Sequence, residues 1–242
     1  MRSRLSSPQL TLIAGNRRQG GFVKGEHAVA AGGAEGSRAL SHSPKSAKKR
    51  DAILRAAIEI INRKSFALAT MSEIAATLDL RDAALYYYFP SKQALAFACH
   101  LQSLERFERM LIAADQKDSP GAAKLEHVLQ DLLFDTAENG PQLYFGDLSY
   151  LTEAQRDEVS IWGLRLIGDL ERFVQEGITD GSIVPCEPKL VVQLLLGMLI
   201  WLAKWVPSIE GVTPDRLMAA MGAVSLKGLE PRQFATGKQT LS

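Results

Sequence analysis

The segment LDLRDAALYYYFPSKQAL, residues 78–95, decides the fold because it places three tyrosines and a phenylalanine directly before Pro-Ser-Lys. Pro90 disfavours helical backbone at the residue before it, so the helix that carries the tyrosines is predicted to span about residues 82–88. Leu85 and Phe89 are four residues apart, and both are predicted to face inward.

The tyrosine triplet cannot pack entirely beside Leu85, because successive helical residues differ by about 100° around the axis. One or two of Tyr86, Tyr87 and Tyr88 must therefore point outward. Phenol hydroxyls at the rim of a recognition helix can donate to phosphate oxygens, and we favour this interpretation for such a cluster. The alternative is that all three are ordinary residues at the edge of an amphipathic core.

Three further helices surround this segment. The apolar residues of KKRDAILRAAIEIINRKSF recur at three- and four-residue steps, which predicts a helix from about residue 46. Thr70 and Glu73 form a T-x-x-E capping box, so the next helix is expected to begin at Met71. Ser91 can cap the helix that follows the tyrosines. Two short helices with a brief turn between them have the dimensions of a helix-turn-helix.

The stretches ILRAAIEII, MSEIAATLDL and ALYYYFPSKQAL closely resemble the N-terminal domain of the tetracycline-repressor-like (TetR) family of bacterial regulators. The resemblance implies an all-α fold, in which an N-terminal three-helix helix-turn-helix domain precedes a C-terminal helical ligand-binding and dimerisation domain. It also implies a dimer that binds a palindromic double-stranded DNA operator and is released by a small molecule. Carried over by position, it implies phosphate contacts by Thr70, Ser72, Tyr86, Tyr88 and Lys92, and major-groove contacts by Arg81, Asp82, Ala83 and Tyr87.

The chain departs from the family pattern in the turn and at the start of the second short helix. Asp79 stands where the family often has glycine, but aspartate tolerates the left-handed conformation. Asp82 is expected to cap the helix, and it can accept a hydrogen bond from a cytosine amino group. Ala84 lacks the hydroxyl that would hold a phosphate. Basic and acidic residues balance over residues 51–92, which is unusual for a DNA-binding domain.

Positive charge is concentrated at the N-terminal end. The whole chain has a net charge of +1, but residues 1–50 hold ten Lys/Arg and two Glu, a balance of +8 that leaves −7 for the rest. This imbalance indicates that the N-terminal end meets a polyanion, with Lys48 and Lys49 supplying electrostatic attraction. A solvated basic tail is the alternative.

Composition divides the chain into four parts. Residues 1–44 are rich in Gly, Ser, Ala and Arg, and are predicted to be a disordered basic extension. An over-extended reading frame or an organelle transit peptide would also explain them. Residues 45–92 are expected to form the helix-turn-helix domain, residues 93–230 the ligand-binding and dimerisation domain, and residues 231–242 a tail.

The apolar stretch at residues 190–203 is interrupted only by Gln193. Fourteen residues are too few to span a bilayer, so no membrane partner is expected, and a helix buried on nearly all sides is predicted. Thr213 caps a last amphipathic helix. We expect a homodimer formed through these two C-terminal helices, about residues 187–228. The alternative is that both helices belong to the core of a monomer.

The C-terminal half loosely resembles TetR-type members that sense acyl-CoA thioesters, which implies a small hydrophobic effector. The candidate lining residues of an apolar tunnel are Phe107, Phe134, Trp162, Leu166, Phe173, Leu195, Met198 and Trp201. Arg106, Arg109 and Arg165 could meet an anionic group or could simply be solvated. His100 and His127 are predicted to face solvent.

Motifs for catalysis are absent from the sequence, which has no G-x-S-x-G, G-x-x-x-x-G-K or H-E-x-x-H pattern. The scattered histidines and the distant Cys99 and Cys186 predict no metal site and no disulfide. We therefore expect no enzyme and no cofactor. The resemblance to the TetR family implies a cytoplasmic, nucleoid-associated, ligand-responsive repressor. The alternative is a helical dimeric interaction or small-molecule-binding module with weak or non-specific DNA binding.

Overall fold

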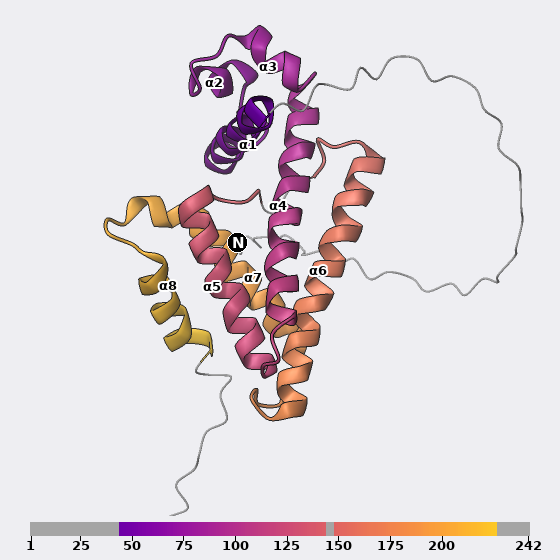
Figure 1. Ribbon diagram of the computed structural model, residues 1–242, viewed down its shortest axis with the longest axis vertical. Coiled ribbons are helices and arrows are strands. Elements are labelled where there is room, and N and C mark those ends of the chain that lie inside the picture. The colour runs from indigo at the N-terminus through magenta and orange to yellow at the C-terminus, as the bar shows by residue number, and fades with distance from the viewer. Residues whose placement is uncertain (1–43, 144–147, 227–242) are drawn as a thin grey trace, which may run out of the picture. The chain divides into compact units, whose positions relative to one another are not determined.

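The computed structural model describes residues 44–143 and 148–226, and within these ranges it contains helices and no strand (Figure 1). The all-α prediction is therefore confirmed. Except for Pro44, the predicted N-terminal extension lies outside the described residues, as does the predicted tail at residues 231–242. The predicted boundaries between the parts stay predictions.

The first three helices form a small unit that we call the head. They are α1 (Pro44–Lys64), α2 (Met71–Ala76) and α3 (Asp82–Tyr88). One face of each helix contributes to a common core, in which Ile53, Ile74 and Leu85 are fully buried. The apolar spacing that predicts these helices is thus the spacing that packs them. The head rests on α4 (Lys92–Asp115), whose residue Leu95 completes the same core.

The remaining helices form the C-terminal part. They are α5 (Gly121–Asn139), α6 (Glu153–Asp180), α7 (Pro188–Trp205) and α8 (Pro214–Met221), with a 3₁₀ turn η1 (Val206–Ser208) and a π-helical turn η2 (Gly222–Leu226). Helices α4, α5 and α6 pack against one another, as Figure 1 shows, while α7 packs on α6 and α8 packs on α5.

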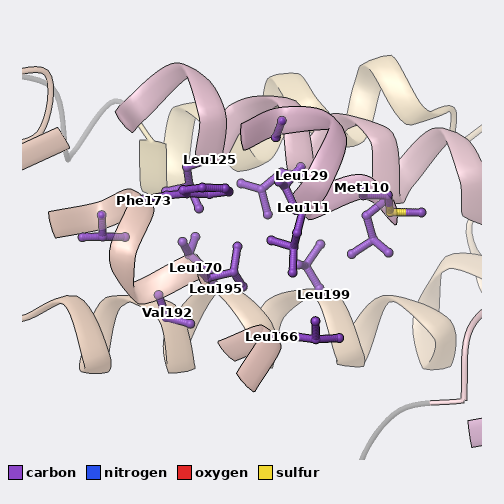
Figure 2. Close-up of a cluster of buried hydrophobic side chains, with 14 of the residues drawn as sticks. Met110, Leu111, Leu125, Leu129, Leu166, Leu170, Phe173, Val192, Leu195 and Leu199 are labelled. Atoms are coloured by element: carbon purple, nitrogen blue, oxygen red, sulfur yellow. The ribbon is translucent and has the colours of Figure 1, made fainter. Parts of the chain in front are cut away.

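Leucines and one phenylalanine fill the C-terminal core. Phe173 is fully buried, and Leu125, Leu129 and Leu166 are nearly so, with their side chains converging from α5 and α6 (Figure 2). Burying a side chain of this size contributes about 1.5–3 kcal/mol each. This dense core explains why most of the apolar residues that sequence analysis selects as tunnel lining have structural roles.

Side-chain caps begin several of the helices. Thr152 and Gln155 form a complete capping box at the start of α6, and the Ser91 hydroxyl accepts from the Ala94 amide at 3.0 Å, as predicted for Ser91. Helix α6 passes through Gly177 without a break and ends at Asp180. Gly121 of α5 and Gly177 of α6 lie against each other. A Cβ atom added at Gly121 would come within 2.2 Å of the Gly177 backbone nitrogen, so glycine at this position allows the two helices to touch.

The prediction that α7 is buried on nearly all sides is also wrong. Val192, Leu195 and Leu199 form one buried stripe, whereas Leu194 on another face is 71% exposed. Within residues 44–143 and 148–226, neighbours cover only one side of this apolar helix. Its remaining apolar surface is available to a partner.

Arg106 is committed to the interior rather than to an anionic ligand. Its side chain is buried and forms an ion pair with Asp135, and it also donates to the carbonyl of Gly140 at 2.8 Å. A buried charge needs such partners. The pair fastens α4 to the end of α5 and thereby fixes the segment that leads to Gln142.

Candidate nucleic-acid interface

Helix α3 presents one anchored face and one open face. Leu85 and Phe89 are buried, as the sequence predicts, while Tyr86 and Tyr87 are 49% and 64% exposed. The expectation that one or two tyrosines point outward is confirmed. Arg81, Asp82 and Ala83 are exposed at the start of the same helix. The exposed side chains of Arg81, Asp82, Ala83, Tyr86 and Tyr87 are thus all carried by one short helix and the residue before it.

Tyr88 occupies an intermediate position. It is half-buried and packs against the core of the head, and its ring meets the Tyr87 ring edge-on with centroids 5.3 Å apart. The three tyrosines therefore differ in burial, and the phosphate contacts predicted for them stay a prediction. Tyr86 and Tyr87 are surface residues, and the half-buried Tyr88 packs against the Tyr87 ring.

The turn before α3 sets the angle between the two short helices. Asp79 has a φ of 53°, in the left-handed region that the sequence predicts for this position. The Leu80 amide donates to the carbonyl of Ala75 at 2.9 Å, which closes the turn. Aspartate thus adopts the left-handed conformation at this position without glycine.

The two hydroxyl residues at the start of α2 are exposed. The Thr70 oxygen caps the helix by accepting from the Glu73 amide at 3.1 Å, and its own proton remains available to an acceptor. Ser72 donates to the carboxylate of Asp82. The prediction that Asp82 caps α3 is wrong, because Arg81 is the N-cap and makes no side-chain capping bond. The Asp82 carboxylate joins α2 to α3 instead.

Lysines at the start of α1 border a hollow beside the tyrosines. The hollow has a volume of about 670 Å³ and is lined by Lys45, Lys48, Lys49, Tyr87 and Tyr88, together with Ser46 and Ala52. Ammonium groups and phenols around a concave surface suit a polyanionic strand. This juxtaposition of residues about forty positions apart is what the sequence alone does not reveal.

Lys92 has a role inside the protein. Its ammonium donates to the carbonyls of Phe66 and Ala69, each at 2.9 Å, and lies 4.3 Å from the centre of the Phe66 ring. A weaker contact of 3.5 Å reaches the carbonyl of Ala67. In this conformation all three N–H groups face the loop between α1 and α2, so the phosphate bond predicted for Lys92 would require one of them to turn away.

A buried histidine connects this loop to α4 and to the segment before α6. The rings of Phe66 and Tyr150 stack with centroids 3.8 Å apart, and the Tyr150 hydroxyl lies 2.8 Å from Nε2 of His100. His100 is 1% exposed, so the prediction that it faces solvent is wrong. Burial lowers the pKa of His100 to about 4, which keeps the imidazole neutral near pH 7.

Few of the predicted tunnel residues line an internal space. Phe107 and Leu166 border a cavity of about 50 Å³ between α4, α5, α6 and α7. Phe134, Trp162 and Met198 are half-buried at the edge of the core. Phe173 and Leu195 belong to the packed core, and Trp201 is 64% exposed, so it cannot line an interior tunnel of this chain.

Helices α6 and α7 share an exposed apolar face, which we define by Ile161 and Leu164 on α6 and Leu190, Leu194 and Trp201 on α7. The segment Pro188–Ser208 has 21 residues and a mean hydropathy of 1.8, enough in length and composition to cross a membrane. The length argument against a membrane span therefore does not hold. The neighbouring α6 also carries exposed apolar residues, and surfaces of this kind mark protein or membrane interaction sites.

Comparison with known proteins finds one family match in the head and another in the C-terminal part. The profile of the bacterial regulatory proteins of the tetR family matches residues 53–99, and that of a tetracyclin repressor-like C-terminal domain matches residues 118–229. The HTH-type transcriptional regulator RutR of Escherichia coli K12 is 27% identical over 171 residues, which are 69% of this chain and 79% of RutR.

Solved structures with the same fold include apo AibR, with a TM-score of 0.61 and 22% identity over 76% of this chain and 99% of AibR. A tetR-family regulator from Rhodococcus RHA1 has a TM-score of 0.63, 22% identity and the same coverage of both chains. AibR has also been solved with isovaleryl coenzyme A and operator DNA, and that complex matches with a TM-score of 0.59 and 20% identity, over 76% of this chain and all of AibR. The two matched profiles, together with this fold, show that the chain belongs to the TetR family of bacterial transcriptional regulators, whose members are not enzymes.

Proposed function

We propose that this chain is a repressor that binds a palindromic operator as a homodimer and leaves it when a small hydrophobic effector binds. The observation that carries this proposal is the open face of α3, where Tyr86 and Tyr87 are exposed while Leu85 anchors the helix in the core. A recognition helix needs this combination, because its exposed side chains can enter the major groove only if the opposite face is held firmly.

The exposed residues divide into two groups by chemistry. Arg81, at the start of α3, can form two bonds with a guanine, and Asp82, Ala83 and Tyr87 would lie beside it in the groove. Phosphate contacts would come from side chains that border this surface, which are Lys48, Lys49, Thr70, Ser72, Tyr86 and Tyr88. Lys92 would support this surface indirectly, because its ammonium holds the α1–α2 loop in place. Phosphate contacts position the head, and the groove contacts select the sequence.

The dimer would form through the apolar face of α6 and α7. This placement differs from the predicted pair of C-terminal helices, because α8 packs on α5 of its own chain while α6 exposes Ile161 and Leu164. Two copies related by a two-fold axis would bury Leu194 and Trp201 and present two heads to successive half-sites. Operator binding of this kind would place the protein on the nucleoid in the cytoplasm.

An effector would bind in the C-terminal part of the chain, where apolar side chains predominate. AibR was solved with isovaleryl coenzyme A, which supports an acyl-CoA-like effector without identifying it for this chain. The interior cavity of about 50 Å³ has room for about one water molecule, so it would have to expand to hold an acyl chain.

A gel-shift titration tests the central proposal. The probe is duplex DNA from the promoter next to the protein's own coding region, and the competitor is random duplex of equal length. We expect retardation that resists an excess of competitor at moderate salt. Retardation that random duplex abolishes equally would favour the alternative, a dimeric binding module without sequence-specific DNA recognition. The balanced charge of residues 51–92 makes that comparison necessary.

A further inference from the structure

A groove lies where the last turn of α1 meets the C-terminal helices. Its volume is about 580 Å³, and its walls come from α1, α5, α7, η1 and α8. Sites for small organic ligands usually measure about 300–1,000 Å³, with mainly apolar walls and a few polar groups. This groove falls within that range, whereas the interior cavity is about 50 Å³.

The floor of the groove is apolar and its rim is charged. Leu132 and Leu199 are buried residues of the floor. The rim holds the cations of Arg63 and Lys204 and the carboxylate of Glu59, which leaves one excess positive charge. Arg63 approaches Glu73 only at 3.5 Å, a loose contact that leaves guanidinium donors for another acceptor. An apolar body with one anionic group complements this arrangement.

The rim also holds the head to the rest of the protein. The Asn62 side chain donates to the carbonyl of Gln142 at 2.9 Å, and the Lys204 ammonium donates to the backbone carbonyl of Asn62. Lys204 belongs to α7 and Asn62 to α1, so this bond spans the two parts of the chain. An anion at the rim would compete with the Asn62 carbonyl for the Lys204 ammonium.

We propose that this groove is the effector site, and that it takes a small amphipathic anion with an apolar body buried on Leu132 and Leu199 and its acidic group at Lys204 and Arg63. The inference rests on the proposed function and adds the location and the chemical class of the effector. Binding removes the Lys204 bond from Asn62, wedges α1 away from α7 and shifts the head that α1 carries. A ligand can change operator affinity only if it binds the two head positions unequally, and a site walled by α1 meets that condition.

Decanoate is the test ligand, because it has an apolar chain and one carboxylate, and decanol is its uncharged counterpart. Isothermal titration of the full chain should show one decanoate bound per chain. Decanol should bind at least about tenfold more weakly than decanoate. Ala137, an exposed groove residue on α5, gives the blocking variant Ala137→Trp. Ala113, an exposed residue of α4 outside the groove, gives the matched control Ala113→Trp.

We expect Ala137→Trp to weaken decanoate binding at least about tenfold and Ala113→Trp to leave it unchanged. The double variant Arg63→Gln, Lys204→Gln should remove the preference of decanoate over decanol. Circular dichroism of each variant confirms that it is folded. Failure of decanoate to bind the folded wild-type chain, or equal binding to Ala137→Trp, would overturn the inference.

Operator release separates this inference from the proposed function. Decanoate should dissociate the wild-type operator complex in a gel shift, whereas the Ala137→Trp complex should form and persist. If decanoate releases both complexes equally, the groove is not the effector site although the repressor proposal stands. If the ligand-free wild-type protein does not retard the operator, the proposed function itself fails.

Discussion

Replacement of Lys92 by methionine separates a structural role from a DNA contact. The substitution keeps the aliphatic stem and removes the ammonium, which donates to the Phe66 and Ala69 carbonyls and lies over the Phe66 ring. These contacts hold the loop between α1 and α2. The N–H groups of Lys92 already face that loop. We therefore expect the loss of the ammonium to lower the stability of the head rather than to remove one phosphate contact.

The size of the effect follows from the geometry. Each hydrogen bond from a charged donor contributes about 1.5–3 kcal/mol when it is well shielded. A cation over a ring adds about 0.5–1 kcal/mol at an exposed site. Lys92 is half-buried, and water can replace it at the freed carbonyls, so we expect a loss of about 2 kcal/mol, which is below the sum. For a chain of this length that corresponds to a fall in Tm of about 4–8 °C.

Two measurements on Lys92→Met decide between the roles, and Lys48→Met is the matched control. We expect Lys92→Met to lower the Tm, to speed amide exchange in the loop and to weaken binding to all DNA sequences without changing its salt dependence. Lys48 is exposed at the start of α1, so Lys48→Met should keep the Tm and reduce the slope of log K against log salt by about 0.9 for each subunit of the dimer. An unchanged Tm together with a reduced slope for Lys92→Met would refute the structural role.

Three further predictions concern the residues proposed to contact DNA, the dimer and the effect of pH. Arg81→Ala should relax the choice between operator and random duplex, whereas Tyr86→Phe should weaken binding to both alike, and quantitative gel shifts with the two duplexes check this division. Leu194→Glu should convert the dimer to monomer in light scattering coupled to size exclusion, whereas Gln193→Glu, also exposed on α7, should leave the dimer intact. Because burial lowers the pKa of His100 to about 4 from 6.5, its contribution to stability is complete above pH 6.5 and declines as the pH falls toward 4. His100→Gln, which can still bond to Tyr150, should flatten the dependence of Tm on pH in that window, and an unchanged profile would show that other groups control it.

Local rules were sufficient to place the head. The residue before Pro90 ends α3, the Thr70 cap begins α2 at Met71, and Asp79 adopts the left-handed turn. Each of these features depends on neighbours within about four positions, and for that reason it is visible in the sequence. The prediction of an outward-facing tyrosine is equally local, since it follows from the helical repeat alone.

The errors arose where a distant residue determines the environment. His100 is buried because Tyr150 reaches it from 50 positions away, and Asp82 is drawn from its cap by Ser72 of the preceding helix. The apolar composition of α7 predicted burial, but composition cannot state whether the covering surface belongs to the same chain. Trp201 illustrates this directly, as it was assigned to a ligand tunnel and lies on the apolar face.

In the proposed mechanism, communication between effector and operator would depend on these distant contacts rather than on the local ones. The head is joined to the C-terminal part by the core that it shares with α4, by the Asn62 bonds to Gln142 and Lys204, and by the stack of Phe66 on Tyr150. In the proposed mechanism an anion in the groove would break the Lys204 bond, whereas the stack of the two rings would remain when charge is added. A ligand that loosens only the Lys204 bond would leave the head attached through the stack. The head would then pivot about Phe66 and Tyr150 instead of detaching, and a pivot is sufficient to take two recognition helices out of register with two half-sites.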